Sequence, residues 1–169
     1  MREPIRKKER ERRALGEPDD VFVTAKKLDS MRRELKQLKT KDRLVLAAEV
    51  ARTAAMGDFS ENAAYQTAKQ QLQRALTRII TLEDKIARAI IIQKHGGTDI
   101  QIGSTITLVR DNGESATYII LGVAESNPSH GAISHLSPLG AALIGKQVGD
   151  RVEVGLANNR CVYTVKNID

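Results

Sequence analysis

The feature that most constrains this chain is a stripe of apolar side chains that recur at alternating spacings of three and four. The stripe consists of Tyr65, Ala68, Leu72, Ala75, Ile79, Leu82, Ile86 and Ala89. A heptad stripe sustained over this length is typical of one helix of a coiled coil, which needs a second helix to cover it. The pattern therefore predicts a long helix from about Ser60 to Ala89.

A partner helix is predicted upstream, beginning just after Thr24, a suitable N-cap residue. One apolar stripe is formed by Leu28, Met31, Leu35 and Leu38. The register then slips, because Asp42, Glu49 and Arg52 stand at positions where a strict heptad has apolar residues. A second apolar set, Leu46, Val50 and Ala54, follows the slip.

Two helices of similar length joined by a short link that contains Gly57 predict an antiparallel helical hairpin over residues 21–95. At 1.5 Å per residue, arms of about 30 residues are about 45 Å long. The small seam residues Ala68, Ala75 and Ala89 permit close approach of the arms, so the expected hairpin is a thin rod with residues 57–61 at its tip.

A second domain is predicted after His95-Gly96-Gly97, where the pattern changes to period two with turn signals. Asp111-Asn112-Gly113 predicts a β-hairpin, and Ser137-Pro138 predicts the start of a short helix. Further strands are expected at residues 132–135, 151–156 and 161–168. Residues 96–169 thus predict a small antiparallel β-sheet domain with a short helix, and the whole chain is of the α+β class.

Residues 1–20 are charged and contain Pro4 and Pro18 but few apolar side chains, so we expect a disordered arm there. Its basic clusters offer contacts to RNA or to an acidic protein surface. No apolar run is long enough to cross a bilayer, and no secretory signal is recognisable. Cys161 has no partner for an internal disulfide. These features indicate a cytoplasmic protein without a membrane segment.

The positive charge is concentrated in the predicted hairpin. The chain has a net charge of +6, and residues 24–95 hold fifteen Lys and Arg against eight Asp and Glu, whereas residues 96–169 hold five against seven. A basic region favours an anionic partner such as nucleic acid, although a solvated helical surface explains the same charge equally well.

The predicted tip carries two carboxylates three residues apart, Asp58 and Glu61. One interpretation is structural, because acidic and hydroxyl side chains stabilise a helix N-terminus. That interpretation leaves Phe59 unexplained. Two carboxylates alone make a weak Mg²⁺ site, so most of any ion that they help to hold must be bound by another molecule. The sequence shows no Ser/His/Asp or Cys/His arrangement and no metal-ligand spacing around its three histidines.

These residues resemble the GreA/GreB family of transcription elongation factors. The tip run Gly57-Asp58-x-Ser60-Glu61-Asn62-Ala63-x-Tyr65 is similar to the signature of that family, and Ile133–Asp150 resembles its FKBP-like domain. The resemblance extends from Val21 to Asp169. Within the family, similarity to the GreB branch is indicated by Tyr65-Gln66, Lys69, Arg78 and Ala54. The usual family residues are replaced at Leu44, Phe59, Ala64 and Ala141.

The resemblance implies a monomer that is not itself an enzyme. It would insert the hairpin into the secondary channel of RNA polymerase and stimulate cleavage of backtracked nascent RNA by the polymerase. Asp58 and Glu61 would help to hold a Mg²⁺ ion of the polymerase active site, with no metal or other cofactor stably bound by the free protein. Gly57, Phe59, Ser60, Asn62 and Tyr65 would shape the tip.

Two further groups of residues are assigned to contacts, one with the polymerase and one with RNA. Docking to the polymerase would involve Ile133, Ser134, Ser137, Pro138 and Leu139. Guidance of the extruded RNA by phosphate contacts is a hypothesis for Lys36, Lys39, Lys69, Arg74, Arg78 and Lys85.

Three other functions remain open. One is an inhibitory relative that occupies the same channel; the retained Asp58 and Glu61 argue against it. A regulator of nucleotide kinases with a related C-terminal domain would have a short hairpin without the acidic tip. A prolyl isomerase would need an aromatic pocket, and the C-terminal domain offers only Tyr118 and Tyr163.

Overall fold

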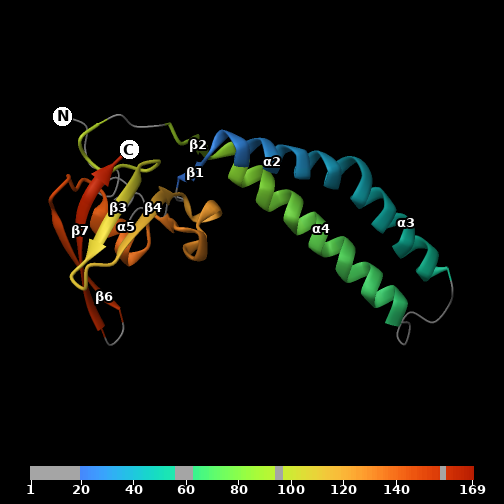
Figure 1. Ribbon diagram of the computed structural model, residues 1–169. Coiled ribbons are helices and arrows are strands. Elements are labelled where there is room, and N and C mark those ends of the chain that lie inside the picture. Colours follow the sequence, from blue (N-terminus) through green and yellow to red (C-terminus); the bar gives the residue numbers. More distant parts are fainter. Residues whose placement is uncertain (1–19, 56–62, 94–96, 157–158) are drawn as a thin grey trace, which may run out of the picture. The chain divides into compact units, whose positions relative to one another are not determined.

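The computed structural model describes residues 20–55, 63–93, 97–156 and 159–169 (Figure 1). The chain divides into two compact units. The described residues of 26–88 form the hairpin unit, and those of 89–169 together with residues 20–25 form the sheet unit. The predicted arm at residues 1–20 lies outside the described residues except for Asp20.

The hairpin unit is built from α2 (Ala25–Gln37), a π-helical segment (Leu38–Asp42), α3 (Arg43–Ala54) and α4 (Ala63–Ala87). The predicted seam of α4 is confirmed, because its buried residues are Ala68, Ala75, Ile79 and Leu82. In α2 the buried residues are Leu28 and Met31, as the first stripe predicts. In Figure 1, α2 and α3 follow each other along the first arm of the hairpin, and α4 forms the second arm.

The π-helical segment coincides with the slip in the heptad register. A π-turn inserts one extra residue into a helix and thereby rotates the residues that follow. Thr40 lies in this segment, and its Oγ1 donates a hydrogen bond to the carbonyl oxygen of Lys36 over 2.8 Å. Leu38, the first residue of the segment, and Leu46, which follows the segment, are both half-buried. The extra residue therefore allows two apolar stripes that differ in register to face the same side of the first arm.

The sheet unit contains a five-stranded sheet in the order β5-β4-β3-β7-β6. The strands are β3 (Thr105–Arg110), β4 (Ser115–Leu121), β5 (Ala132–Ser134), β6 (Arg151–Leu156) and β7 (Asn159–Ile168). All neighbours are antiparallel except β4 and β5, which pair in parallel. The α+β class is confirmed, with a mixed sheet in place of the fully antiparallel one expected.

The predicted turn at residues 111–113 is confirmed. Gly113 adopts a positive φ of 86°, a conformation that glycine reaches without strain. Its N–H donates to the carbonyl oxygen of Arg110 over 2.9 Å, and Asn112 Oδ1 accepts from the N–H of Glu114. The turn thus joins β3 to β4 in the predicted way.

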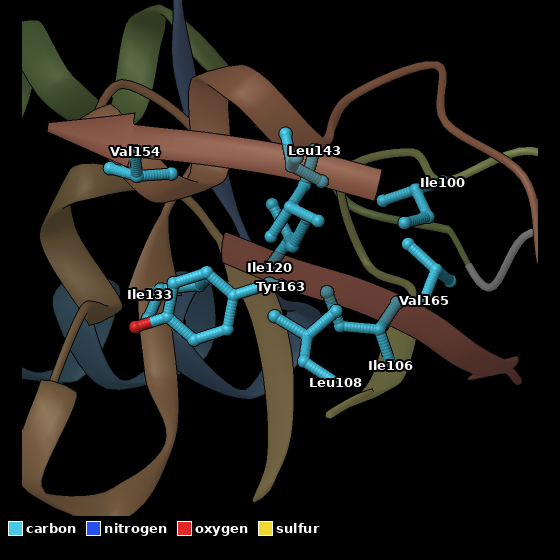
Figure 2. Packing of buried hydrophobic residues seen from close by; sticks show 10 residues of the cluster. Ile100, Ile106, Leu108, Ile120, Ile133, Leu143, Val154, Tyr163 and Val165 are labelled. Carbon is cyan, nitrogen blue, oxygen red and sulfur yellow. The ribbon is translucent and has the colours of Figure 1, made fainter. Parts of the chain in front are cut away.

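One hydrophobic core lies in the sheet unit (Figure 2). Ile100, Ile106 and Ile120 are fully buried, and Leu143 from α5 (Pro138–Leu143) packs among them. Figure 2 shows the Tyr163 ring at one end of the cluster and Ile100 at the other. Burial of several large aliphatic side chains is the main force that stabilises a domain of this size.

A two-stranded parallel pair was not expected from the sequence. β1 (Val21–Val23) pairs with β2 (Ala89–Ile91), so Ala89, which was assigned to the helical seam, lies in a strand. Thr24 follows β1, and both its N–H and its Oγ1 donate to the Glu125 carboxylate, over 2.6 and 2.7 Å. The chain thus enters and leaves the hairpin through neighbouring strands.

Candidate functional site

The predicted tip residues Gly57, Asp58, Phe59, Ser60, Glu61 and Asn62 lie outside the described residues. Their place in the chain is nevertheless defined, because the described helices end before them at Ala54 and resume after them at Ala63. The two carboxylates therefore belong to the segment that connects the arms of the hairpin.

The described residues next to this segment leave no buried polar group unsatisfied. Thr53 is 1% exposed, and its Oγ1 donates to the carbonyl oxygens of Glu49 and Val50 over 2.9 and 3.1 Å. On the other arm Ala68 is buried and Tyr65 is half-buried. The Thr53 hydroxyl, which hydrogen-bonds within its own helix, and the small side chain of Ala68 permit close packing of the two arms at this end of the hairpin.

Arg52 and Glu49 form a two-point ion pair on the surface of α3. Arg52 Nε and Nη2 donate to the two carboxylate oxygens of Glu49 over 2.9 and 2.6 Å. The hydrogen bond lowers the pKa of Glu49 and raises the pKa of Arg52. Because the charges compensate each other, the last turns of α3 add little net charge near the connecting segment.

The RNA-guiding candidates divide into two groups. Lys36, Lys69 and Arg74 are exposed. Among the described residues, neither Lys69 nor Arg74 has an ion-pair partner. By contrast, Lys39 pairs with Glu83 on the opposite arm, and Lys85 is half-buried.

Arg78 also pairs across the hairpin, with Glu34. Arg78 Nε and Nη2 donate to the Glu34 carboxylate over 2.7 and 3.0 Å. The hydrogen bond lowers the pKa of Glu34 and raises the pKa of Arg78. Arg78 and Lys39 thus connect α4 to the first arm, which leaves Lys36, Lys69 and Arg74 as the stronger candidates for contact with RNA.

The predicted docking residues surround the turn that starts α5. Ser137 is the N-cap: its Oγ accepts from the N–H of Gly140 over 3.1 Å and donates to the carbonyl oxygen of Ser134 over 2.7 Å. Ser134 Oγ accepts from the N–H of Leu136. The two hydroxyls therefore fix the shape of the turn, whereas Pro138 and Leu136 are exposed on it.

The other two docking candidates belong to the core. Ile133 is 6% exposed, and Leu139 packs against the core cluster. A Cβ added at Gly140 would lie 2.1 Å from the carbonyl oxygen of Ser134, so only glycine fits there. Ile133, Leu139 and Gly140 thus hold the turn in place. The surface of the turn that another protein can contact is formed by Leu136 and Pro138.

No local pattern indicates the Glu125 carboxylate that binds Thr24, because the two residues are 101 positions apart. Within the described ranges no three or more His, Cys, Asp or Glu side chains come together as a metal site. In the same residues no helix is both long enough and apolar enough to span a membrane.

Comparison with known proteins matches nearly all of the described chain. The family "Transcription elongation factor, N-terminal" of GreA/GreB matches residues 21–91, and "Transcription elongation factor, GreA/GreB, C-term" matches residues 93–169. The transcription elongation factor GreA of Nautilia profundicola is 39% identical over 143 residues, which are 83% of this chain and 88% of that protein. The GreA of Rickettsia conorii is 40% identical over 150 residues, 87% of this chain and 93% of that protein.

Among solved structures, GreA factor homolog 1 of Thermus thermophilus is 25% identical, with a TM-score of 0.41, over 89% of this chain and 99% of that one. Both relatives named above are called GreA, and the lean toward GreB stays a prediction. The matches to both halves of the chain, together with the identity to GreA proteins over most of their length, decide the family. This chain belongs to the GreA/GreB family of transcription elongation factors.

Proposed function

We propose that this protein binds RNA polymerase, reaches into the secondary channel with its helical hairpin, and stimulates the polymerase to cleave backtracked nascent RNA. The single observation that carries the proposal is the position of Asp58 and Glu61 in the segment that connects the two arms, in a chain of the GreA/GreB family. On this account the protein is a helper of another enzyme and performs no reaction alone.

The dimensions of the hairpin support such a role. α4 contains 25 residues, which corresponds to about 37 Å at 1.5 Å per residue. Its seam includes the buried alanines Ala68 and Ala75, which permit close approach of the opposite arm. A long, narrow pair of helices can carry the connecting segment into an opening that admits no globular domain.

The chemistry of Asp58 and Glu61 fits a supporting role toward Mg²⁺. Carboxylate oxygens are the ligands that this hard cation prefers, but two of them leave most of its octahedral shell to other ligands. In hydrolysis of a phosphodiester by two metal ions, the ions stabilise the attacking and leaving oxygens. Asp58 and Glu61 would complete a coordination sphere supplied mainly by the polymerase and would orient the attacking water.

The sheet unit would supply the second contact. The turn around Ser137 is fixed by internal hydrogen bonds and by the close packing of Gly140, and it leaves Pro138 exposed. A rigid, exposed turn loses little conformational freedom on binding. We therefore assign docking on the polymerase to this turn, with Pro138 and Leu136 as its contact residues.

Lys69 and Arg74 would then lie alongside the RNA that emerges from a backtracked complex. Contacts between cations and phosphates release counterions, so they weaken as the salt concentration rises. Both side chains are exposed on α4, the helix that directly follows the acidic segment. Neutralising them together should reduce cleavage most in deeply backtracked complexes, where more RNA is extruded.

The test is a cleavage assay on purified, backtracked RNA polymerase complexes. Adding the protein should release short RNA fragments that contain the old 3′ end and should let the complexes resume elongation. The protein with RNA but without polymerase is the control and should cut nothing. Inhibited elongation without new fragments would support the inhibitory alternative, and absence of any effect would refute the proposal.

A further inference from the structure

The inner face of the sheet continues beyond the core and is left uncovered at one end. Leu108 and Arg110 are two residues apart in β3, so their side chains point to the same face of the sheet. Directly opposite positions share a face, which places Ala116 beside Leu108 and Tyr163 beside Arg110. Because Leu108 and Tyr163 belong to the core cluster, this face is the core face.

A cavity of about 360 Å³ occupies the uncovered end. Its lining residues are Leu108, Arg110, Glu114, Ser115, Ala116, Tyr118 and Tyr163. Leu108 is 1% exposed and forms an apolar floor, and small side chains at Ser115 and Ala116 leave the space open. The cavity has room for a side chain of the size of leucine.

One wall of the cavity carries a positive charge that is only weakly compensated. The Arg110 guanidinium lies 5.5 Å from the centre of the Tyr163 ring, which holds it over the cavity. Glu114 is its acidic neighbour, but Nη1 and Oε2 are 3.4 Å apart and the two side chains are 45% and 68% exposed. An exposed pair of this length contributes little, so an incoming carboxylate can replace Glu114 at small cost.

We propose that this cavity binds a segment of a partner protein that presents an apolar side chain next to a carboxylate. The apolar side chain would lie on Ala116 and Tyr118, and the carboxylate would accept hydrogen bonds from Arg110. The assignment does not depend on the cleavage function or on the connecting segment of the hairpin.

RNA is the less suitable ligand for two reasons. Residues 96–169 carry more acidic than basic side chains, which disfavours a polyanion. Recognition of single-stranded RNA also depends on bases that stack on aromatic rings, but Tyr163 is only 4% exposed and Arg110 lies over its ring.

The test is a titration of the ¹⁵N-labelled full-length protein with the probe N-acetyl-Leu-Asp-amide, followed by amide chemical shifts. Saturable shifts at Leu108, Arg110, Ala116 and Tyr118 are expected, with a Kd on the order of 1 mM for so small a probe. N-acetyl-Leu-Asn-amide, which lacks the carboxylate, should bind about tenfold more weakly. Equal affinity for the two probes, or shifts that are scattered and do not saturate, would overturn the proposal.

Three variants separate the parts of the site. Arg110→Gln should lower the affinity for the Asp probe about tenfold, and Glu114→Gln should raise it about twofold to fivefold. Ala116 is exposed and its position tolerates a larger side chain, so Ala116→Leu should fill the cavity and remove binding. Arg151→Gln is the matched control, because Arg151 is an exposed arginine paired with Asp111 that does not line the cavity.

Arg110→Gln also removes the contact with Tyr163, so that variant alone could lose binding through a local change of structure. Stronger binding in Glu114→Gln, which keeps Arg110 in place, would exclude this explanation. Weaker binding in Glu114→Gln, or retained binding in Ala116→Leu, would contradict the proposal. A uridine oligonucleotide that shifts the same amides in competition with the peptide would assign the cavity to RNA instead.

Discussion

The hairpin unit and the sheet unit of this protein bury apolar side chains in different ways. In the sheet unit, Ile106, Ile120 and Leu143 are fully buried in one cluster that draws on several strands and α5. In the hairpin unit, burial follows a narrow seam in which alanine alternates with larger residues. The sheet unit is therefore stabilised by a compact core, whereas the hairpin is long and buries less apolar volume.

The largest effect is expected in the sheet core. Ile120→Ala removes a fully buried side chain from the middle of the cluster and should cost about 2–5 kcal/mol of unfolding free energy, through lost transfer energy and the cavity left behind. In a Tyr65→Phe background both remaining tyrosines lie in the sheet unit, so tyrosine fluorescence reports this unit alone. A loss below about 1 kcal/mol would show that the sheet core is less decisive than its burial indicates.

A smaller and more local effect is expected in the seam. Leu82 is 1% exposed, and Leu82→Ala should lower the stability of the hairpin by about 2–3 kcal/mol, because a narrow seam relaxes more easily around a deletion. Circular dichroism at 222 nm should report the change, while the tyrosine signal of the sheet unit should be unaffected. Simultaneous loss of both signals would break the distinction between the units.

The π-helical segment offers a test of the hairpin's design. Deleting Thr40 should convert residues 38–42 into regular helix and bring Leu46 and Val50 into the heptad register set by Leu28 and Met31. Stability should change by less than about 1 kcal/mol. Because the arm becomes about 1.5 Å shorter, the connecting segment should be displaced and RNA cleavage should fall. Unchanged cleavage would show that the extra residue has no role in placing that segment.

The smallest effect concerns the ion pair of Glu34 and Arg78. The pKa of Glu34 lies below its ordinary value of 4.5 because Arg78 donates hydrogen bonds to the carboxylate. Glu34 therefore contributes stability that is fully present above pH 4.5 and is lost as the pH falls through the lowered pKa. Both side chains are more than a third exposed, so Glu34→Gln should cost less than about 1 kcal/mol near neutral pH.

The pH dependence provides the control. Unfolding curves of the hairpin at pH 6 and pH 3 should differ less in Glu34→Gln than in the unchanged protein. An equal pH dependence in the two proteins would show that the pair does not stabilise the folded hairpin.

Periodicity was a good guide wherever one face of an element is buried. The stripe from Ala68 to Leu82 gave the second arm, and Asp111-Asn112-Gly113 gave the β-hairpin, because both patterns are local. The slip at Asp42 was visible in the sequence, but its cause, a π-helical insertion, was not, since apolar spacing does not distinguish a π-turn from an ordinary change of stripe.

Long-range contacts were beyond the reach of such reasoning. The pairing of β1 with β2 joins residues 21–23 to residues 89–91, and Glu125 binds Thr24 across 101 positions. The sequence did not indicate that Lys39 and Arg78 each pair with a carboxylate on the opposite arm, and their guidance of RNA stays a prediction. The roles of Asp58 and Glu61 rest on sequence and family membership, because these residues lie outside the described ranges.

The most direct test of the central claim compares polymerase binding with RNA cleavage in Asp58→Asn and Glu61→Gln. Each substitution removes one negative charge and keeps the size of the side chain. If the sheet unit docks and the connecting segment assists Mg²⁺, both variants should bind the backtracked polymerase with unchanged Kd and unchanged Tm, while the cleavage rate falls by at least about a hundredfold. Normal cleavage in both variants, or loss of cleavage that merely follows a loss of binding or of Tm, would contradict the account.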